Sequence, residues 1–530
     1  MKTFKRFSAI LLAVLLMVAM MAVPASATET LTPHTIYIAN EETGHIYEVY
    51  QLFKGTLNAS GIMTGITWGS GVSTEGQATL GSTDSIVSSL KTVADAENFG
   101  RQVGPYLENP IATISQVTEN DGKKGYWVGG LDDGYYLIKD KDDSLNNTEH
   151  AYTQYIIQVV DNVEVSPKSS TATLLKDVSR NQSTGYAKAT SVMIGGDAYY
   201  RLIASVPAHI HSYNQFYMKI EDVLPAGVSY VELVGIYAVN GEEYEDYTHS
   251  VPENYYVCAH VGQTVSITLK NAKDAIEAAS GASILLEDKI MVIYKAKLNE
   301  NAVIGMDSTG TGVDGNVNTA VMTYSNDPNE VYVDTPLHTG KTAKATATLY
   351  TYQVDLTKIG SGSDKPVLDG AQFVAYYKVG STGTPQYLVV DTTGKVTHTV
   401  NSEENATKLT TANGGKLNII GVPSGVLHLK EIVAPDGYNL PSVEFVVSIN
   451  GSLDGTTGKL GTFSASITGT SEPVTVNKTT GTVYVTIPNR IGSTLPETGG
   501  IGTPIFYGIG GVLVIAALAL LTVRKRSAAK

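Results

Sequence analysis

The chain has almost no cysteine and no excess of positive charge. Its 530 residues include a single cysteine, Cys258, so no disulfide can form within the chain and any covalent stabilisation needs other chemistry. Lysine and arginine number 37 against 51 acidic residues, for a formal net charge of -14. Nucleic-acid binding depends on basic patches, so this balance excludes nucleic acid as a partner.

Recognisable catalytic and metal-binding patterns are also missing. No Ser/His/Asp grouping or phosphate-binding loop emerges, and His209 and His211 have no third ligand at useful spacing. Asp307 and Asp314 lie in a glycine-rich stretch without the spacing of a calcium loop. We therefore predict a protein that is not an enzyme and has neither a metal site nor a cofactor.

Helical periodicity is sparse, and strand patterns dominate. Only Ser82–Val93 and Asn271–Ala279 favour helices. Elsewhere Thr, Val, Ile and Tyr alternate with polar residues between Gly, Asn and Asp clusters, which is typical of antiparallel β-sandwiches. The clearest strands are predicted at Ile36–Ile38, Tyr152–Val160, Thr264–Leu269, Ile290–Lys297, Phe445–Ile449 and Val483–Ile487. The alternating run around Cys258 predicts a buried strand residue.

Both ends carry export and membrane patterns. A basic start, an apolar run from Ala9 to Val23 and the small residues Ala25-Ser26-Ala27 predict a signal peptide over residues 1–27. Near the other end, residues 505–523 are apolar and long enough to span a membrane, and a basic Arg524-Lys525-Arg526 follows. The body is therefore expected outside the cell, held at its C-terminus.

Two Pro-containing linkers divide the body into blocks. Val165–Ser170 and Asp334–Ala343 interrupt the strand patterns. We predict an all-β chain with an N-terminal domain at 28–165, a middle domain at 170–336 and a C-terminal domain at 345–492. A terminal signal at 495–530 follows.

That terminal signal resembles the cell-wall sorting signals of Gram-positive bacteria. Leu495, Pro496, Glu497, Thr498 and Gly499 form an LPXTG motif directly before the apolar span and the basic tail. The resemblance implies that a sortase cleaves after Thr498, holds it as a thioester and transfers it to an amine. It also implies a secreted, cell wall-anchored protein that is membrane-held before cleavage.

The C-terminal block carries a second resemblance. Glu431, Ala434, Pro435, Gly437 and Tyr438 resemble the E-box of Cna B-type domains, which are immunoglobulin-like sandwiches, although Leu427 and Ile432 replace the usual Tyr and Thr. The family pattern implies that Lys358 on the first strand and Asn489 on the last condense into an isopeptide bond. Glu431 would be the proton shuttle. Burial would make this lysine a neutral nucleophile and keep the acid protonated.

The middle block resembles the middle domains of backbone pilins. The stretches that carry this likeness are Gly195–Pro207, Ile220–Gly227 and Tyr324–Pro328. The resemblance implies a bond between Lys176 and Asn318 with Asp222 as the acid. Asn326 is a competing acceptor, and Asp222 could instead be a turn residue before Pro225. The first block has Gly134–Ile138 as a family-like strand but no matching set, and Lys54 is its only tempting amine.

Finally, Val163-Glu164-Val165-Ser166-Pro167-Lys168 resembles the pilin motif, with Ser166 in place of Tyr. The whole chain thus resembles LPXTG-anchored major (backbone) pilins of sortase-assembled pili. This implies that Thr498 of one subunit is joined to Lys168 of the next, building a fimbria that is finally anchored to peptidoglycan and supports adhesion. The implied partners are a pilus-type (class C) sortase, a housekeeping sortase, identical subunits, and tip and base pilins. The alternative is a monomeric wall-anchored adhesin that binds a host matrix ligand.

Overall fold

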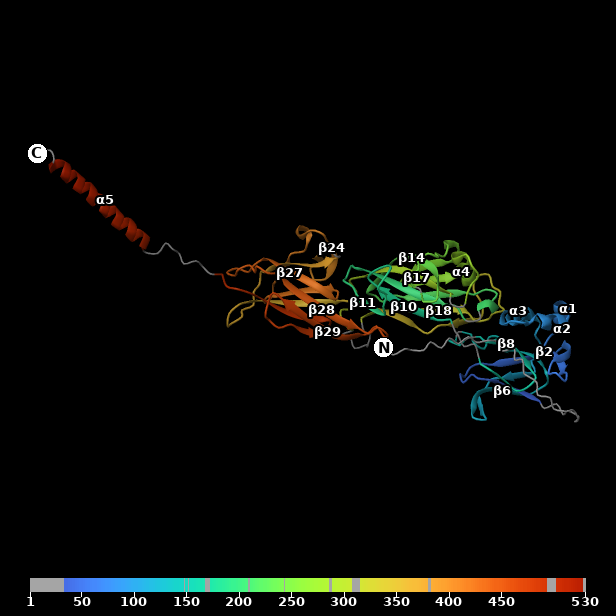
Figure 1. Ribbon diagram of the computed structural model, residues 1–530. Helices are drawn as coiled ribbons and strands as arrows, with labels where there is room; N and C mark the ends of the chain where they lie inside the picture. Colours follow the sequence, from blue (N-terminus) through green and yellow to red (C-terminus); the bar gives the residue numbers. More distant parts are fainter. Residues whose placement is uncertain are drawn as a thin grey trace.

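The structure is a computed structural model that describes residues 33–146, 148–150, 152–166, 172–207, 210–242, 244–285, 288–306, 315–379, 383–492 and 502–527. The signal peptide, Lys168 and the LPXTG residues lie outside these ranges, as do His209, Asp307 and Asp314. Figure 1 shows a row of β-rich bodies, with the first domain at one end and the C-terminal helix extending from the other. The expected all-β architecture of tandem sandwiches is confirmed.

The first domain pairs two small sheets and covers one end with helices. One sheet has the order β5 (Thr118–Asn120), β6 (Lys123–Leu131), β1 (His34–Ile38) and β9 (Val163–Val165). The other has the order β3 (Met63–Trp68), β2 (Tyr47–Leu57), β7 (Gly134–Asp140) and β8 (Gln154–Val159), with β4 (Ala112–Ile114) beside β2. The helices are α1 (Thr74–Leu80), α2 (Thr83–Ser89), α3 (Val93–Val103) and the 3-10 turn η1 (Gly104–Tyr106).

The helix expected over Ser82–Val93 is interrupted in the structure. Helix α2 ends at Ser89, and Thr92 begins α3 with a capping box in which its side chain accepts a hydrogen bond from the Asp95 amide. Because a capping box satisfies the free amides of a new helix, Thr92 starts a second helix rather than continuing the first.

The middle domain is a larger sandwich. One sheet has the order β10 (Leu174–Ser179), β12 (Asp197–Ser205), β17 (Asp288–Leu298) and β14 (Val228–Asn240). The other has the order β11 (Ala189–Ser191), β20 (Ala345–Tyr350), β18 (Asn316–Ser325), β13 (Met218–Val223), β16 (Thr264–Leu269) and β15 (Val257–Val261), with β19 (Thr339–Lys341) beside β18. The expected second helix is α4 (Ala272–Ser280), and Asn271 is its N-cap residue.

Cys258 lies on β15, the outer strand of this sheet, and is only partly buried. The predicted strand is confirmed, but the prediction that Cys258 is buried is wrong, since β15 is an edge strand with a neighbour on one side only. Burial still raises the pKa of the Cys258 thiol, which keeps it in the less reactive protonated form.

The C-terminal domain is the third sandwich. One sheet has the order β26 (Lys416–Val422), β21 (Tyr352–Gly360), β31 (Thr482–Asn489) and β30 (Thr475–Asn477). The other has the order β24 (Val396–Val400), β23 (Thr384–Val390), β22 (Gln372–Val379), β27 (Gly425–Val433), β28 (Phe445–Leu453) and β29 (Leu460–Thr468), with β25 (Leu409–Thr410) beside β22. Helix α5 (Gly502–Ser527) follows the described part of this domain.

The boundary between the hydrophobic cores of the middle and C-terminal domains lies further along the chain than the sequence suggests. Strand β20 pairs with β18, and Ala345, Ala347 and Leu349 are buried in the middle core. The next core begins with Tyr350 and Tyr352. We therefore propose a domain boundary at Thr351 in place of the 336–345 segment. The Pro-containing linker pattern misplaced the boundary because it does not show that one more strand, β20, returns to the middle sheet.

The first and middle domains meet at a polar joint. The Asn326 side chain accepts from the Tyr152 amide (3.1 Å) and donates to the carbonyls of Leu145 and His150 (3.3 Å each). A backbone hydrogen bond from Lys341 to Thr148 (2.9 Å) lies beside it. Buried side-chain hydrogen bonds of this kind hold two bodies in a defined orientation because their loss leaves unpaired polar groups.

His338 adds a pH-sensitive contact to this joint. Its Nε2 lies 2.8 Å from Asp143 of the first domain, and its Nδ1 lies 3.0 Å from Glu330 of the middle domain. Burial alone would lower the pKa of His338, but Glu330, Asp327 and Asp143 outweigh it and raise the pKa. A raised folded-state pKa gives stabilisation that is fully present below the unfolded-state pKa and is lost as the pH rises through the folded-state pKa.

We therefore predict that the joint loosens as the pH rises from about 6 to about 8. Calorimetric unfolding of the first domain should begin at lower temperature at the higher pH. In His338→Gln this part of the pH dependence should disappear, since Gln cannot be protonated. An identical pH dependence in the variant would contradict the prediction.

Candidate functional site

Lys358 is a buried lysine in the C-terminal domain. Along β21 the inward positions Tyr352, Val354 and Leu356 alternate with partly exposed ones, and Lys358 is the next inward residue. Asn489 takes the corresponding place at the end of β31, in phase with Val485 and Ile487. The period-two geometry of strands thus places a charged and an amide side chain in the core.

These two strands and a third bring Lys358, Asn489 and Glu431 together. Strands β21 and β31 run parallel as neighbours, with Lys358 opposite Ile487 and Gly360 opposite Asn489. Lys358 Nζ contacts Asn489 Oδ1 and lies 3.2 Å from Glu431 Oε2. Glu431 lies on β27 of the facing sheet, and its Oε1 accepts a hydrogen bond from Asn489 Nδ2 (2.5 Å). All three side chains are withdrawn from water.

Burial changes the ionisation of this cluster in the expected direction. Loss of solvent lowers the pKa of Lys358 to about 8, although the charge of Glu431 acts against the shift. Loss of solvent likewise raises the pKa of Glu431, against the opposing effect of Lys358 and of the hydrogen bond from Asn489. Both shifts favour the neutral amine and the protonated acid, which are the forms that acyl transfer to an amine requires.

The middle domain has a second buried cluster that bridges its two sheets. Lys176 on β10 and Asp222 on β13 are both fully buried and in direct contact. Asn318 on β18 is also fully buried, and β13 and β18 are paired neighbours. Burial lowers the pKa of Lys176 to about 8, with Asp222 acting against the shift.

Tyr294 on β17 connects this second cluster and has no counterpart in the sequence motifs. Its hydroxyl donates to Asp222 Oδ2 (2.8 Å) and accepts from Asn318 Nδ2 (2.7 Å). Burial, followed by the charge of Asp222, raises the pKa of Tyr294, so the phenol stays protonated. Asn318 Oδ1 and Asp222 Oδ1 are buried without a hydrogen-bond partner. Burying polar atoms without a hydrogen-bond partner costs free energy. Two such atoms in one buried cluster therefore point to a functional role.

The geometry separates the two candidate acceptors in this domain. Asn318 lies in the cluster, whereas the side chain of Asn326 is hydrogen-bonded to backbone groups of the first domain. Asp222 is a buried strand residue, so the alternative that it is a turn residue is wrong. Pro225 comes after the strand has ended.

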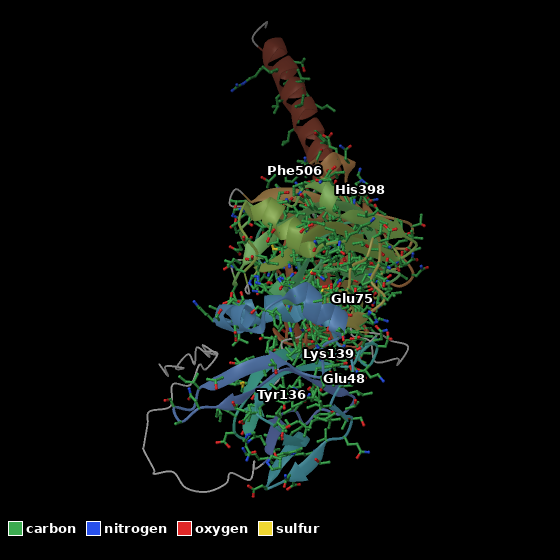
Figure 2. The ribbon with its side chains drawn as sticks, turned by 90° about the vertical axis from the view of Figure 1, so that its right-hand side faces the viewer. Glu48, Glu75, Tyr136, Lys139, His398 and Phe506 are labelled. Atoms are coloured by element: carbon green, nitrogen blue, oxygen red, sulfur yellow. The ribbon has the colours of Figure 1, made fainter. Side chains whose placement is uncertain are left out.

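The first domain presents a different arrangement. Lys54 is exposed on β2. Lys139, labelled beside Glu48 in Figure 2, is buried and pairs with Glu48 (3.8 Å) and Asp142. Among the described residues of this domain, the polar contacts of Lys139 are to carboxylates and none is to an asparagine.

The C-terminal helix α5 agrees with the predicted membrane span. Phe506–Arg524 is long and apolar enough to cross a membrane, and its residues are exposed. This range differs by one residue at each end from the predicted 505–523. Figure 2 shows the labelled Phe506 near the start of this helix, which stands clear of the β-domains.

Comparisons with known proteins agree with this architecture. Residues 352–459 match the family model described as the SpaA prealbumin-like fold domain. A search of curated proteins finds the trypsin-resistant surface T6 protein of Streptococcus pyogenes serotype M6, 25% identical over 334 residues, which cover 51% of this chain and 56% of that protein. The match thus spans little more than half of that relative.

Among solved structures, the T6 backbone pilin of S. pyogenes has a TM-score of 0.50 at 16% identity and covers 88% of this chain and 100% of that one. Its structure is described as modular and three-domain, decorated with variable loops and extensions. The full-length major pilin SpaD of Corynebacterium diphtheriae has a TM-score of 0.46 at 16% identity, covering 88% and 99%.

The tandem β-sandwiches have the fold of the T6 backbone pilin, and in this chain an apolar C-terminal helix follows them. With the match to the SpaA prealbumin-like model and the T6 surface protein, the chain is similar to major pilins of Gram-positive bacteria.

Proposed function

We propose that the chain is the structural subunit of a covalent cell-surface pilus, polymerised by a sortase that joins Thr498 of one subunit to Lys168 of the next. The observation that carries this proposal is the pair of buried lysine, acid and asparagine clusters. Each lies between an early and a late strand of its domain. Such clusters suit a protein that must carry tension without disulfides.

In each cluster the proposed reaction is a condensation. The neutral lysine Nζ attacks the Cγ of the asparagine side chain and forms an amide bond, while Nδ2 leaves as ammonia. In the C-terminal domain Asn489 Nδ2 already contacts Glu431, which can protonate the leaving amine and accept the proton from Lys358. In the middle domain Asp222 has this role for Lys176 and Asn318, and Tyr294 orients the amide.

The order of the proposed joints explains which domains need a cross-link. Lys168 follows β9, which ends the first domain, and precedes β10 of the middle domain. Tension between Lys168 and Thr498 of one subunit therefore runs through the middle and C-terminal domains and bypasses the first. These are the two domains that contain the clusters.

The same proposal covers the cellular setting. A pilus-type (class C) sortase joins the subunits, a housekeeping sortase transfers the finished fibre to peptidoglycan, and tip and base pilins complete it. The fibre supports adhesion. The chain itself is a sortase substrate whose only catalysis is the formation of its own internal bonds.

The proposal is tested on the bacterium that expresses the chain. Cell-wall digests boiled in detergent and probed with an antibody to the middle domain should show a ladder of high-mass bands, since amide joints resist both heat and reductant. A single band near the monomer mass would instead support the monomeric adhesin and overturn the pilus proposal.

A further inference from the structure

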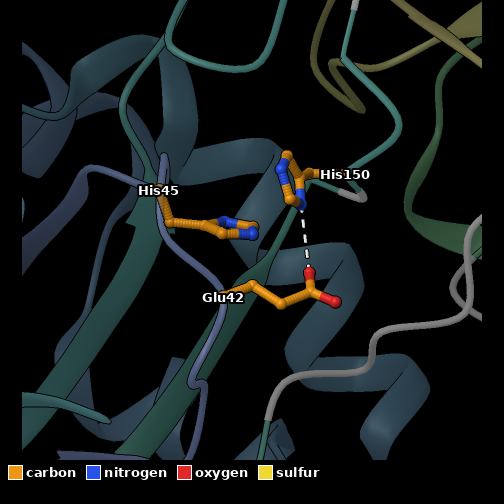
Figure 3. A group of neighbouring side chains, drawn as sticks. All are labelled: Glu42, His45 and His150. Atoms are coloured by element: carbon orange, nitrogen blue, oxygen red, sulfur yellow. Dashed lines mark hydrogen bonds and ion pairs between the residues drawn. The ribbon is translucent and has the colours of Figure 1, made fainter. Parts of the chain in front are cut away.

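Three potential metal ligands gather in the first domain, away from the lysine clusters. Glu42 and His45 lie in the turn between β1 and β2, and His150 lies in the loop between β7 and β8. Their ligand atoms all lie within 4.8 Å of one another, and His150 Nδ1 is 3.0 Å from Glu42 Oε2. Figure 3 shows the two rings and the carboxylate approaching one another from these two segments.

His45 is held as a metal-binding histidine is held. Its Nδ1 lies 2.8 Å from Oδ1 of Asp140, and both side chains are buried. The other oxygen of Asp140 accepts a hydrogen bond from the Thr153 amide (2.8 Å). A carboxylate that binds one ring nitrogen fixes the orientation of the ring and leaves the other nitrogen free for a metal, as in carboxylate–histidine–zinc triads.

The surrounding backbone places the remaining ligands beside this nitrogen. The Glu42 amide donates to Asn40 Oδ1 (3.0 Å), and the Glu42 carbonyl accepts from the Tyr126 hydroxyl (2.8 Å). The rings of His45 and His150 meet edge to face with centroids 5.0 Å apart. Glu42 is exposed and His150 is partly exposed, so their side chains can adjust to a bound ion.

We propose that Glu42, His45 and His150 bind a zinc ion, with water as the fourth ligand. Two imidazole nitrogens and one carboxylate form a donor set that zinc uses in proteins. In a tetrahedral zinc site the ligand atoms are about 3.3 Å apart, so only a small closure of the two exposed side chains is needed.

The position of the site gives the ion a structural role at the joint between domains. The carbonyl of His150 accepts a hydrogen bond from Asn326 of the middle domain. Zinc would tie the β1–β2 turn to the loop that Asn326 holds, and so stiffen the connection of the first domain to the middle domain. This role does not depend on polymerisation or on the internal cross-links.

The sequence alone did not indicate this site, because His150 comes 105 positions after His45 and no short spacing pattern joins them. The chain fold brings the β1–β2 turn beside the β7–β8 loop, and only then do the ligands meet.

The test uses the full-length chain in mild detergent, without a histidine tag and stripped of metal by a chelator. Titration calorimetry with zinc chloride should show one ion bound per chain, and thermal unfolding of the first domain should shift upward with zinc. Glu42→Gln replaces an exposed ligand and His150→Gln a partly exposed one with side chains of similar size, so the fold should persist. Both should lose the calorimetric signal and the thermal shift.

The matched control is His398→Gln, which replaces an exposed histidine of the C-terminal domain and should bind zinc as the parent does. Unfolding curves without zinc show whether each variant is folded. Absence of binding to the parent chain would overturn the proposal. So would equal binding by all variants, which would mean that scattered surface histidines capture the ion.

Discussion

Replacing Lys168 with arginine should abolish the covalent ladder and leave a monomer attached to the cell wall. Arginine retains the positive charge, but its guanidinium stays protonated and cannot act as the amine nucleophile. Thr498 is unchanged, so the sortase thioester still forms and can still be passed to the wall. The measurement is an immunoblot of detergent-boiled wall digests from cells whose sole copy is the variant.

The matched control for this variant is Lys54→Arg. Lys54 is an exposed lysine on β2 of the first domain, and the same substitution there should leave the ladder unchanged. If the ladder persists in Lys168→Arg, another lysine is the acceptor and the proposed joint is wrong. If it is lost in both variants, the effect does not belong to Lys168.

The second large effect concerns the internal bonds. The mature body should be lighter than its sequence mass by two ammonia masses, one for each condensation. Glu431→Gln should restore the ammonia of the C-terminal domain alone, and Asp222→Asn that of the middle domain alone. Each variant removes the group that shuttles protons while keeping its size. Intact-mass spectrometry under denaturing conditions measures the deficit directly.

The loss of a bond should also lower stability. The bond between Lys358 and Asn489 would close a loop of 131 residues. By analogy with disulfide loop entropy, such a closure contributes about 5 kcal/mol. For a domain of this size the melting temperature should then fall by about 10–20 °C when the bond is absent. Without the bond, the amine of Lys358 and the amide of Asn489 remain as separate polar groups in the core, and their burial lowers stability further. The mass deficit reports the bond alone and is therefore the more direct measurement.

Asp355→Asn provides the control for these variants. Asp355 is a partly buried acid on β21, the same strand as Lys358, but it is not part of the cluster. The full mass deficit should remain in this variant. A parent body with the plain sequence mass would remove both proposed bonds.

The sequence was sufficient to predict the elements that depend on local pattern. Sequence pattern predicted β16 to the residue and β17 and β31 to within two. In β16 the inward side chains recur every second residue, as expected of a half-buried strand, whereas β17 is an almost continuous buried run. The E-box motif selected Glu431, and the family pattern implied Lys358 on the first strand and Asn489 on the last. The structure brings these three side chains into contact. The apolar run near the C-terminus predicted helix α5.

Predictions that depended on long-range pairing were less successful. Asn318 and Asn326 belong to one β-rich stretch and look equivalent along the chain, yet one faces a core and the other crosses to the first domain. Tyr294 is one of 31 tyrosines, and only the approach of β17 to β13 and β18 gives it a role. Likewise, only the pairing of β20 with β18 shows that β20 belongs to the middle domain.

The sequence by itself thus determined the all-β class, the apolar C-terminal span, and the residue types of the two buried lysine clusters. These depend on composition and on spacing within short segments. The tertiary structure decided which asparagine joins the buried cluster of Lys176, where one core ends and the next begins, and that Glu42, His45 and His150 lie together. Each of these is a contact between residues far apart in the chain, and such contacts exist only after the sheets have paired and packed.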